Sequence, residues 1–267
     1  MRIISPTELE TFNDCRLKHH YRYTRRLRPK VDDISQALAS GRAVHDTLKV
    51  ALAPGNWDST LKSLASESLW KNLGEVEKVE KYLPGVMRAL NKIPQFVWEG
   101  SWHVEEVVEG DIKPMWLDEV ITLRGRPDMW QIAKTPFGEV VQILDVKTTA
   151  NNALDYMLWN PQLRLYAYCL ASQYPGIPIE YQYVCVPTTS APAQIAPPFA
   201  FTTPMWESVV RYVEAIYDVM LDGDISPRES RDCKFCDFAN ICKVRITGGN
   251  PESVISEEYF TKERENV

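Results

Sequence analysis

Two acidic residues and a lysine have spacings that suit hydrolytic chemistry on a phosphate. The segment Gly125-Arg126-Pro127-Asp128 is followed seventeen residues later by Asp145-Val146-Lys147. Because side chains alternate between the two faces of a strand, Asp145 and Lys147 should point to one side at the end of the apolar run VVQIL. Two carboxylates with an open position suit Mg²⁺ or Mn²⁺. A lysine beside them can orient a water molecule or stabilise charge that builds on a phosphate.

A simpler interpretation of the acid–lysine pair is a surface ion pair next to a turn, because short patterns of this kind are common. Two further pairs of residues bear on the choice. Gly41 and His45 stand four residues apart in a segment with helical spacing, and Gln162 and Tyr166 repeat that separation later. His45 would either complete a metal site beside the two carboxylates or be a hydrogen-bonded histidine of the core.

The periodicity of apolar residues predicts the elements that must position these groups. Helical spacing covers residues 36–52, 59–73, 75–92 (broken at Pro84-Gly85), 161–172 and 205–221. Short runs rich in Val, Ile and Trp predict strands at 102–109, 115–123, 128–133, 139–146 and 179–186. Asn160-Pro161 is a typical helix start. This order predicts a mixture of helices and mostly antiparallel strands around one central sheet.

The order of the four motifs, GxxxH, GxxD, DxK and QxxxY, resembles the RecB-type branch of the PD-(D/E)XK nuclease superfamily, which includes CRISPR-associated exonucleases. Residues 5–9 (SPTEL), 12–15 (FNDC) and 21–23 (YRY) are similar to the opening segment of that branch. The resemblance extends from residue 5 to residue 242. It implies an α/β fold: a restriction-endonuclease-like core with a central mixed β-sheet flanked by helices, an N-terminal helical region and a C-terminal cysteine segment.

The resemblance also implies metal-dependent hydrolysis of phosphodiester bonds in DNA. Carried over residue by residue, the implied ligands of Mg²⁺ or Mn²⁺ are His45, Asp128, Asp145 and the carbonyl group of Val146. Lys147 completes the implied catalytic set with the two acids, and Gln162 and Tyr166 would position the DNA strand. The acid before Val146 is Asp rather than the more common Glu, which keeps the charge and shortens the side chain by one methylene.

Three cysteines near the C-terminus form a compact group, Cys233-x-x-Cys236 followed by Cys242, and Cys15 lies 218 residues before them. Four thiolates suit either tetrahedral Zn²⁺ or a cubane iron–sulfur cluster, and spacing alone does not separate the two. The resemblance implies a [4Fe–4S] cluster that joins both ends of the chain. The two other cysteines, Cys169 and Cys185, stand in apolar surroundings and are interpreted as buried thiols.

The charge is unevenly distributed along the chain. The 30 basic and 36 acidic residues give a net charge of −6, yet residues 16–30 hold seven Lys or Arg and no acid. Such a segment predicts contacts with phosphates, for which we select Arg25, Arg26 and Arg28, while neighbouring aromatic side chains could stack on unpaired bases. A solubilising charged surface is the alternative.

These observations predict a single nuclease domain over residues 1–245, with 50–100 as a helical insertion and 246–267 as a polar tail. We expect an exonuclease that acts on DNA ends or single strands in recombination, repair or phage DNA processing. The alternatives are a non-catalytic iron–sulfur module that binds nucleic acid, the nuclease subunit of a larger helicase or CRISPR adaptation complex, and a structural zinc protein. The chain has no GxxxxGK[ST] motif, so a helicase would be a separate partner. No apolar run reaches bilayer length and the N-terminus lacks the apolar core of a signal peptide, which predicts a cytoplasmic protein of a bacterial, archaeal or phage-infected cell.

Overall fold

The computed structural model of the chain describes residues 2–30, 36–52, 60–148 and 159–263. The chain divides into two compact units. The first unit contains Met1–Ile3 and Ile34–Val209, and the second contains Ile4–Asp33 and Val210–Val267. The first unit therefore holds every residue of the predicted catalytic set, and the second joins an early segment of the chain to its last quarter.

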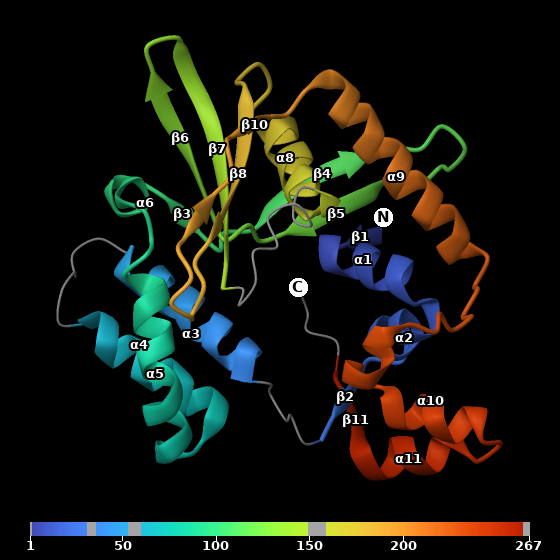
Figure 1. Cartoon of the computed structure of the whole chain (residues 1–267). Helices are drawn as coiled ribbons and strands as arrows, with labels where there is room; N and C mark the ends of the chain where they lie inside the picture. Colours follow the sequence, from blue (N-terminus) through green and yellow to red (C-terminus); the bar gives the residue numbers. More distant parts are fainter. Residues whose placement is uncertain (1, 31–35, 53–59, 149–158, 264–267) are drawn as a thin grey trace. The chain divides into compact units, whose positions relative to one another are not determined.

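The main sheet of the first unit has the strand order β10-β8-β7-β6-β3, and β9 pairs with β8 (Figure 1). Its strands are β3 (His103–Val104), β6 (Met129–Thr135), β7 (Gly138–Lys147), β8 (Ile179–Cys185), β9 (Gln194–Ile195) and β10 (Phe199–Ala200). The central strand β7 runs antiparallel to β6 and parallel to β8. The sheet is mixed, as expected, and β7 is its longest strand because an apolar run fills its middle.

A second sheet of the first unit has the order β1-β5-β4. Its strands are β1 (Arg2–Ile4), β4 (Val108–Ile112) and β5 (Ile121–Gly125). The predicted strand 102–109 is therefore divided, since β3 ends at Val104 and β4 begins at Val108. The division falls at Glu105, whose φ of +50° does not fit an extended strand.

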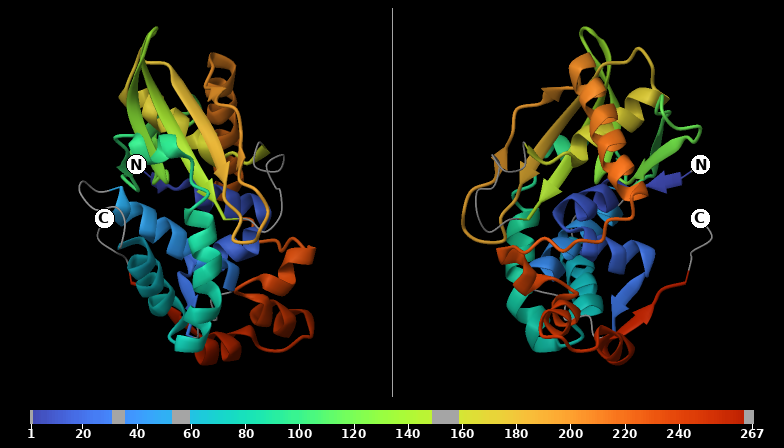
Figure 2. Two further views of the ribbon diagram at one scale, coloured as in Figure 1. Left: turned by 60° about the vertical axis from the view of Figure 1, so that its left-hand side comes forward. Right: turned by 90° about the vertical axis from the view of Figure 1, so that its right-hand side faces the viewer.

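The helices of the first unit include four from segments with helical spacing and one short helix that the spacing did not predict. They are α3 (Gln36–Ala51), α4 (Thr60–Leu73), α5 (Val76–Leu90), the short α6 (Gln95–Glu99) and α8 (Gln162–Gln173). Helices α3, α4 and α5 gather into a bundle (Figure 2), and their apolar faces share one core with Leu144 and Val146 of β7 and Val184 of β8. Side chains alternate along β7, so Asp145 and Lys147 project to the opposite face of the strand from Leu144 and Val146.

The predicted break at Pro84 does not occur, since α5 continues through it. A proline removes one backbone hydrogen bond from a helix interior and ordinarily kinks or ends the helix. Here Val79, Val86 and Leu90 are all buried in the core on both sides of Pro84. Burial of this apolar face offsets the lost bond and keeps the helix intact.

The second unit is built from short elements around a small aromatic core. Its elements are α1 (Pro6–Asp14), α2 (Arg16–His19), a π-helical turn (His20–Thr24), β2 (Leu27–Pro29), a 3₁₀ turn (Arg231–Phe235), α10 (Ala239–Ile246), α11 (Pro251–Glu258) and β11 (Tyr259–Thr261). Leu17, Tyr21, Phe238 and Tyr259 are buried together in it. Helix α9 (Thr203–Leu221) extends across the division between the units.

The segment 246–267, expected to be a polar tail, is structured through most of its length. Asn250 caps α11 by accepting a hydrogen bond from the Glu252 N–H, and Pro251 occupies the first turn. Strand β11 then pairs antiparallel with β2, with Tyr259 opposite Pro29. Few apolar residues are needed for this docking, which is why composition alone suggested a tail. No helix among the described residues is long and apolar enough to cross a membrane.

Candidate functional site

The two predicted acids lie opposite each other at one end of the β6–β7 ladder. Met129 of β6 pairs with Leu144 of β7, so the same register places Asp128, which directly precedes β6, across from Asp145. Directly opposed residues of an antiparallel pair point to the same face. The Val146 N–H donates a hydrogen bond to Asp128 Oδ2 at 2.8 Å, which ties the first carboxylate to the strand that carries the second.

Each carboxylate has a basic partner from the predicted set. His45 Nδ1 lies 3.4 Å from Asp128 Oδ1. Lys147 Nζ lies 2.9 Å from Oδ1 and 2.8 Å from Oδ2 of Asp145. Asp145 is 1% exposed, whereas the Lys147 side chain is 32% exposed, so this is no ordinary surface ion pair. The structure therefore joins His45 to the acids and leaves the lysine head accessible.

Glycine 41 explains how α3 brings His45 to this end of the sheet. A Cβ atom added at Gly41 would lie 3.0 Å from Thr148 Oγ1, just after β7. A side chain at this position would require the helix or the Thr148 side chain to move by a few tenths of an ångström, so glycine allows the observed close approach. His45 follows one turn later on the same helix face, within reach of Asp128. The GxxxH spacing is therefore a packing requirement as well as a chemical one.

Two residues with no sequence signal lie around Asp128: Glu105 contacts it directly, and Lys49 contacts Glu105. The Glu105 N–H donates to the Asp128 carbonyl oxygen at 3.1 Å, and Glu105 adopts a left-handed backbone conformation to do so. Its carboxylate pairs with Lys49 Nζ at 2.5 Å, and Lys49 lies one turn beyond His45 on α3. No sequence signal marked either residue, because Glu105 stood inside a predicted strand and the lysine looked like an ordinary surface residue.

The electrostatics of the carboxylate pair separate the two acids. Burial, and next the neighbouring charge of Asp128, raise the pKa of Asp145 to about 6. Burial also disfavours the charged form of Asp128, but attraction and hydrogen bonding to His45 outweigh it and lower the pKa of Asp128. Burial likewise opposes the imidazolium, and the same pairing with Asp128 overcomes it and raises the pKa of His45.

Gln162 and Tyr166 lie one turn apart on α8, which packs against β7 and β8. The Gln162 side-chain amide donates to the Tyr166 hydroxyl at 2.9 Å, and Tyr166 is buried. Just before the helix, the Asn160 side chain accepts a hydrogen bond from the Gln162 N–H at 2.7 Å. The helix therefore begins one residue later than predicted, with Pro161 and not Asn160 at its N-cap. A role of the amide–phenol pair in DNA positioning stays a prediction.

The donor set around the carboxylates fits a hard divalent cation. Buried Asp145 and partly buried Asp128, close enough to repel each other, offer the oxygen ligands that Mg²⁺ or Mn²⁺ prefers. Within the described residues, no three carboxylate, imidazole or thiol groups converge closely enough to bind an ion as they stand.

In the second unit, Cys15 lies close to the C-terminal cysteine group. The Arg228 N–H points to Cys15 Sγ at 3.5 Å, and the Ser230 N–H points to Cys233 Sγ at 3.3 Å. Cys15, Cys236 and Cys242 all pack against the aromatic core. Burial, and next repulsion from the other three thiols, raise the pKa of Cys242. Such N–H groups would favour charged sulfurs, and the binding of a metal or cluster by these cysteines stays a prediction.

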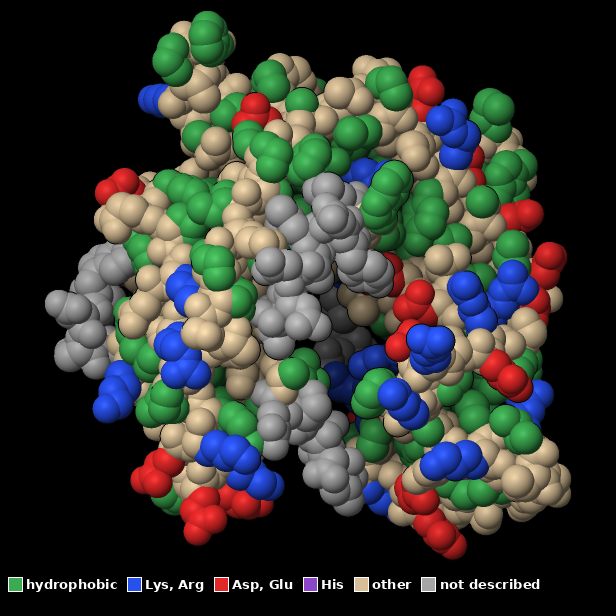
Figure 3. Space-filling view, in the orientation of Figure 1, with side chains coloured by type: hydrophobic (Ala, Val, Ile, Leu, Met, Phe, Trp, Pro, Cys, Tyr) green, Lys and Arg blue, Asp and Glu red, His purple; other side chains and the backbone are tan. Residues whose placement is uncertain are grey.

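The arginines predicted to contact DNA lie in this second unit, and two of them have protein partners. Both guanidinium nitrogens of Arg25 bond to the Glu252 carboxylate, at 2.7 and 2.8 Å. Arg28 donates to the carbonyl oxygens of Arg22 and Leu27. Acidic side chains stand beside basic ones over α10 and α11 in Figure 3. Because Arg25 and Arg28 already bond to protein groups, this segment offers fewer free cations to DNA than its composition suggests. Its contacts with DNA stay a prediction.

Residues 3–243 match the family described as the PD-(D/E)XK nuclease superfamily. The chain is similar in structure to the protein reported as "Putative exonuclease" from Eubacterium rectale, at 13% sequence identity with a TM-score of 0.53, covering 88% of this chain and 87% of that one. It also matches the crystal structure of SSO0001, at 17% identity with a TM-score of 0.44, covering 90% and 85%. No curated protein matches. The chain, with its restriction-endonuclease-like α/β fold, belongs to the PD-(D/E)XK nuclease superfamily.

Proposed function

We propose that this protein is a metal-dependent DNA nuclease that hydrolyses phosphodiester bonds, as an exonuclease acting on DNA ends or single strands. The observation that carries the proposal is the pair of carboxylates, partly buried Asp128 and buried Asp145, facing each other with the Lys147 ammonium beside Asp145. Membership of the nuclease superfamily supports the reaction class. A binding module without catalysis would have no need for this costly arrangement.

In this proposal Asp128, Asp145 and the Val146 carbonyl would hold Mg²⁺ or Mn²⁺, with His45 as a further ligand. The ion would act as a Lewis acid on the phosphate and would lower the pKa of a bound water. The Lys147 ammonium, now paired with Asp145, would orient the attacking water or stabilise charge on the phosphate oxygens. Gln162 and Tyr166 would orient the strand.

The deciding experiment is a digestion panel of end-labelled single-stranded, double-stranded and circular DNA, with Mg²⁺, Mn²⁺ or EDTA. We expect cleavage of linear substrates with either ion and none in EDTA. Lys147→Ala should cut at least about 100-fold more slowly, the usual scale for losing an electrostatic catalyst. Lys134→Ala, an exposed lysine on β6, is the matched control and should cut at the parent rate. Equal rates for both variants would refute the assignment.

We further propose that Cys15, Cys233, Cys236 and Cys242 bind one [4Fe–4S] cluster. The two backbone N–H groups aimed at sulfur atoms and the mutual influence of the thiols support it. Protein purified without oxygen should be brown and contain about four irons per chain. Colourless protein with one zinc would replace the cluster by Zn²⁺ and keep the four ligands, whereas protein without metal would refute the site.

A further inference from the structure

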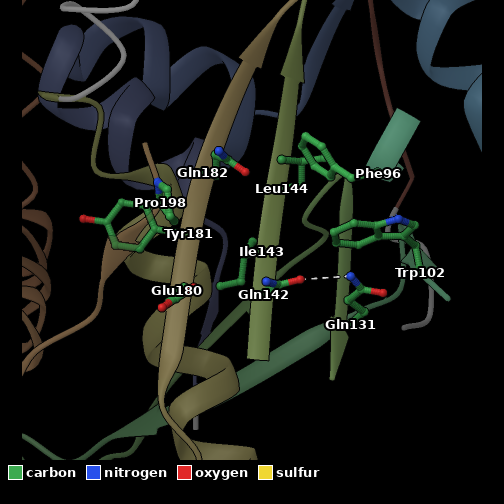
Figure 4. Close-up of a pocket in the computed structure, with 10 residues that line it drawn as sticks. All are labelled: Phe96, Trp102, Gln131, Gln142, Ile143, Leu144, Glu180, Tyr181, Gln182 and Pro198. Carbon is green, nitrogen blue, oxygen red and sulfur yellow. Dashed lines mark hydrogen bonds between the residues drawn. The ribbon is translucent and has the colours of Figure 1, made fainter. Parts of the chain in front are cut away.

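A separate cavity of about 350 Å³ lies on the main sheet of the first unit (Figure 4). Its floor is formed by neighbouring positions of β6, β7 and β8, and aromatic rings from α6 and the segment after it form one wall. Gln142, on this floor, precedes Asp145 by three residues and points to the opposite face of β7. The cavity is thus distinct from the carboxylate pair. Its volume lies in the range of small-molecule sites.

A chain of hydrogen bonds fixes the orientation of the amides on the cavity floor. The Ser101 N–H donates to Gln131 Oε1 at 3.0 Å, and Gln131 Nε2 donates to Gln142 Oε1 at 2.9 Å. Each amide oxygen is committed as an acceptor, so the Gln142 amide presents its NH₂ group to the cavity as a donor. The polarity of this group follows from the network and not from an arbitrary choice of amide rotamer.

Acceptors stand beside that donor on the adjacent strand. Glu180 of β8 is the register partner of Gln142, at the strand separation of about 4.8 Å. No hydrogen bond or ion pair among the described residues engages the Glu180 carboxylate. Gln182 donates its NH₂ to the Ala196 carbonyl at 2.6 Å, which leaves its own oxygen as a second acceptor. The floor therefore presents one donor, the Gln142 NH₂, beside two acceptors on β8: the charged Glu180 carboxylate and the Gln182 amide oxygen.

The aromatic wall is rigid on one side. The Trp102 indole N–H donates to the Val97 carbonyl at 2.8 Å, and a Cβ atom added at Gly100 would lie 2.1 Å from the same indole nitrogen. The indole is therefore held by a hydrogen bond and by a close approach that only glycine permits. Phe96 extends this wall and is 41% exposed. Among the described residues that line the cavity there is no lysine or arginine, which argues against a phosphate as its occupant.

We propose that this cavity binds an unpaired guanine base. Guanine offers an acceptor, O6, to the Gln142 NH₂ and two adjacent donors, N1–H and N2–H₂, to the Glu180 carboxylate, while its ring lies against Trp102 and Phe96. Adenine and thymine lack this pattern of one acceptor beside two donors. The base belongs either to a free guanine nucleotide or to a single strand of DNA. Binding needs neither a metal ion nor cleavage, so the inference goes beyond the proposed function.

The test is calorimetry in EDTA with guanosine, inosine and adenosine 5′-monophosphates. We expect saturable binding of the guanine nucleotide, with the inosine nucleotide weaker because it lacks N2–H₂, and the adenosine nucleotide at least tenfold weaker. Glu180→Gln keeps the size of the side chain and should weaken guanine binding at least tenfold. Glu139→Gln, at the exposed start of β7, is the matched control and should change nothing.

Single-stranded oligothymidylate with and without one central guanine separates the two sources of the base. Preference for the guanine oligonucleotide that is lost in Glu180→Gln assigns the site to a DNA strand, and binding of the mononucleotide alone assigns it to a free nucleotide. No saturable binding, equal affinity for guanine and adenine nucleotides, or an unchanged Glu180→Gln variant would each overturn the proposal. Because the Lys147→Ala variant should bind guanine normally, failure of this site and failure of the proposed nuclease activity are distinguishable.

Discussion

Asp145 is placed where its charge destabilises the fold, which gives a residue-scale prediction. Its pKa in the folded protein is about 6, above the ordinary value near 3.9, because it is buried beside Asp128. The folded state therefore binds this proton more tightly than the unfolded state. In EDTA, stability of the parent protein should fall as pH rises from about 4 to 6 and then level off as far as this group is concerned.

The Asp145→Asn variant should show the trade between stability and activity. Cleavage should fall at least about 100-fold, while the melting temperature in EDTA should equal or exceed that of the parent, by a margin that grows between pH 4 and pH 7. Calorimetry across this pH range measures it. A variant that melts earlier than the parent at pH 7 would contradict the buried-charge explanation, whatever its activity.

The cysteines give a second residue-scale prediction. Burial raises the pKa of Cys169 to about 12, and Cys185 is also buried with a raised pKa, whereas Cys233 is exposed. Alkylation requires the thiolate and access to it. In metal-free native protein at pH 8, we expect iodoacetamide to modify Cys233 first and to spare Cys169 and Cys185 until the protein is unfolded. Mass spectrometry of timed digests tests this order, and early labelling of Cys169 would contradict it.

The sequence predicted which polar residues lie together better than it predicted their surroundings, for a physical reason. Asp128, Asp145 and Lys147 are marked by strand alternation and by motif spacing, both of which are local. The Arg25–Glu252 pair joins residues 227 positions apart, and the Glu105–Lys49 pair depends on an unusual backbone angle. Nothing in a single sequence reports such pairings. Composition alone therefore overestimates how many cations of residues 16–30 are free to contact DNA.

At the scale of elements, the approach of α3 to the end of β7 gives a third prediction. Ala is a better helix former than Gly by about 1 kcal/mol, yet its Cβ at position 41 would meet Thr148 Oγ1 at 3.0 Å. Gly41→Ala should therefore keep or slightly raise the melting temperature while lowering cleavage, because the displaced helix carries His45. The double variant Gly41→Ala/Thr148→Ala removes the close contact and should regain activity. Lost activity without rescue would indicate another role for Gly41.

The predicted elements agree with the structure where periodicity and flanking residues support the same bounds. They differ where apolar residues alone suggested an element. Strand β7 and helix α8 were both found close to their true bounds, since an apolar run and the Asn160 hydrogen bond define them. The strand expected at 115–123 starts only at Ile121, and Met115 and Trp116 before it are exposed. Apolar residues in a loop mimic a strand when their burial is unknown.

At the scale of the whole molecule, each unit has its own core, and the second is assembled from distant parts of the chain. The register of β11 on β2 brings Tyr259 beside Pro29, although 230 positions separate them. The proposed catalytic residues and the four cysteines thus belong to separately packed units. Mg²⁺ or Mn²⁺ added at the carboxylates should therefore slow hydrogen exchange in the first unit. A metal bound by the four cysteines should slow it in the second unit.

The last prediction concerns the strand that closes the second unit. Tyr259 is 6% exposed, stacks on Phe238 at 5.7 Å and donates its hydroxyl to the Asp237 carbonyl at 2.6 Å, whereas the next residue, Phe260, is 50% exposed. Tyr259→Ala should cost the second unit about 3 kcal/mol, the scale of a buried aromatic truncation. Phe260→Ala removes a similar ring from the same strand and should cost less than about 0.5 kcal/mol, as surface changes do. Hydrogen exchange of residues 16–30 and denaturant unfolding measure the difference. Equal effects of the two variants would mean that β11 does not stabilise this unit through its tyrosine, and that the C-terminal segment is the loosely docked tail its composition suggests.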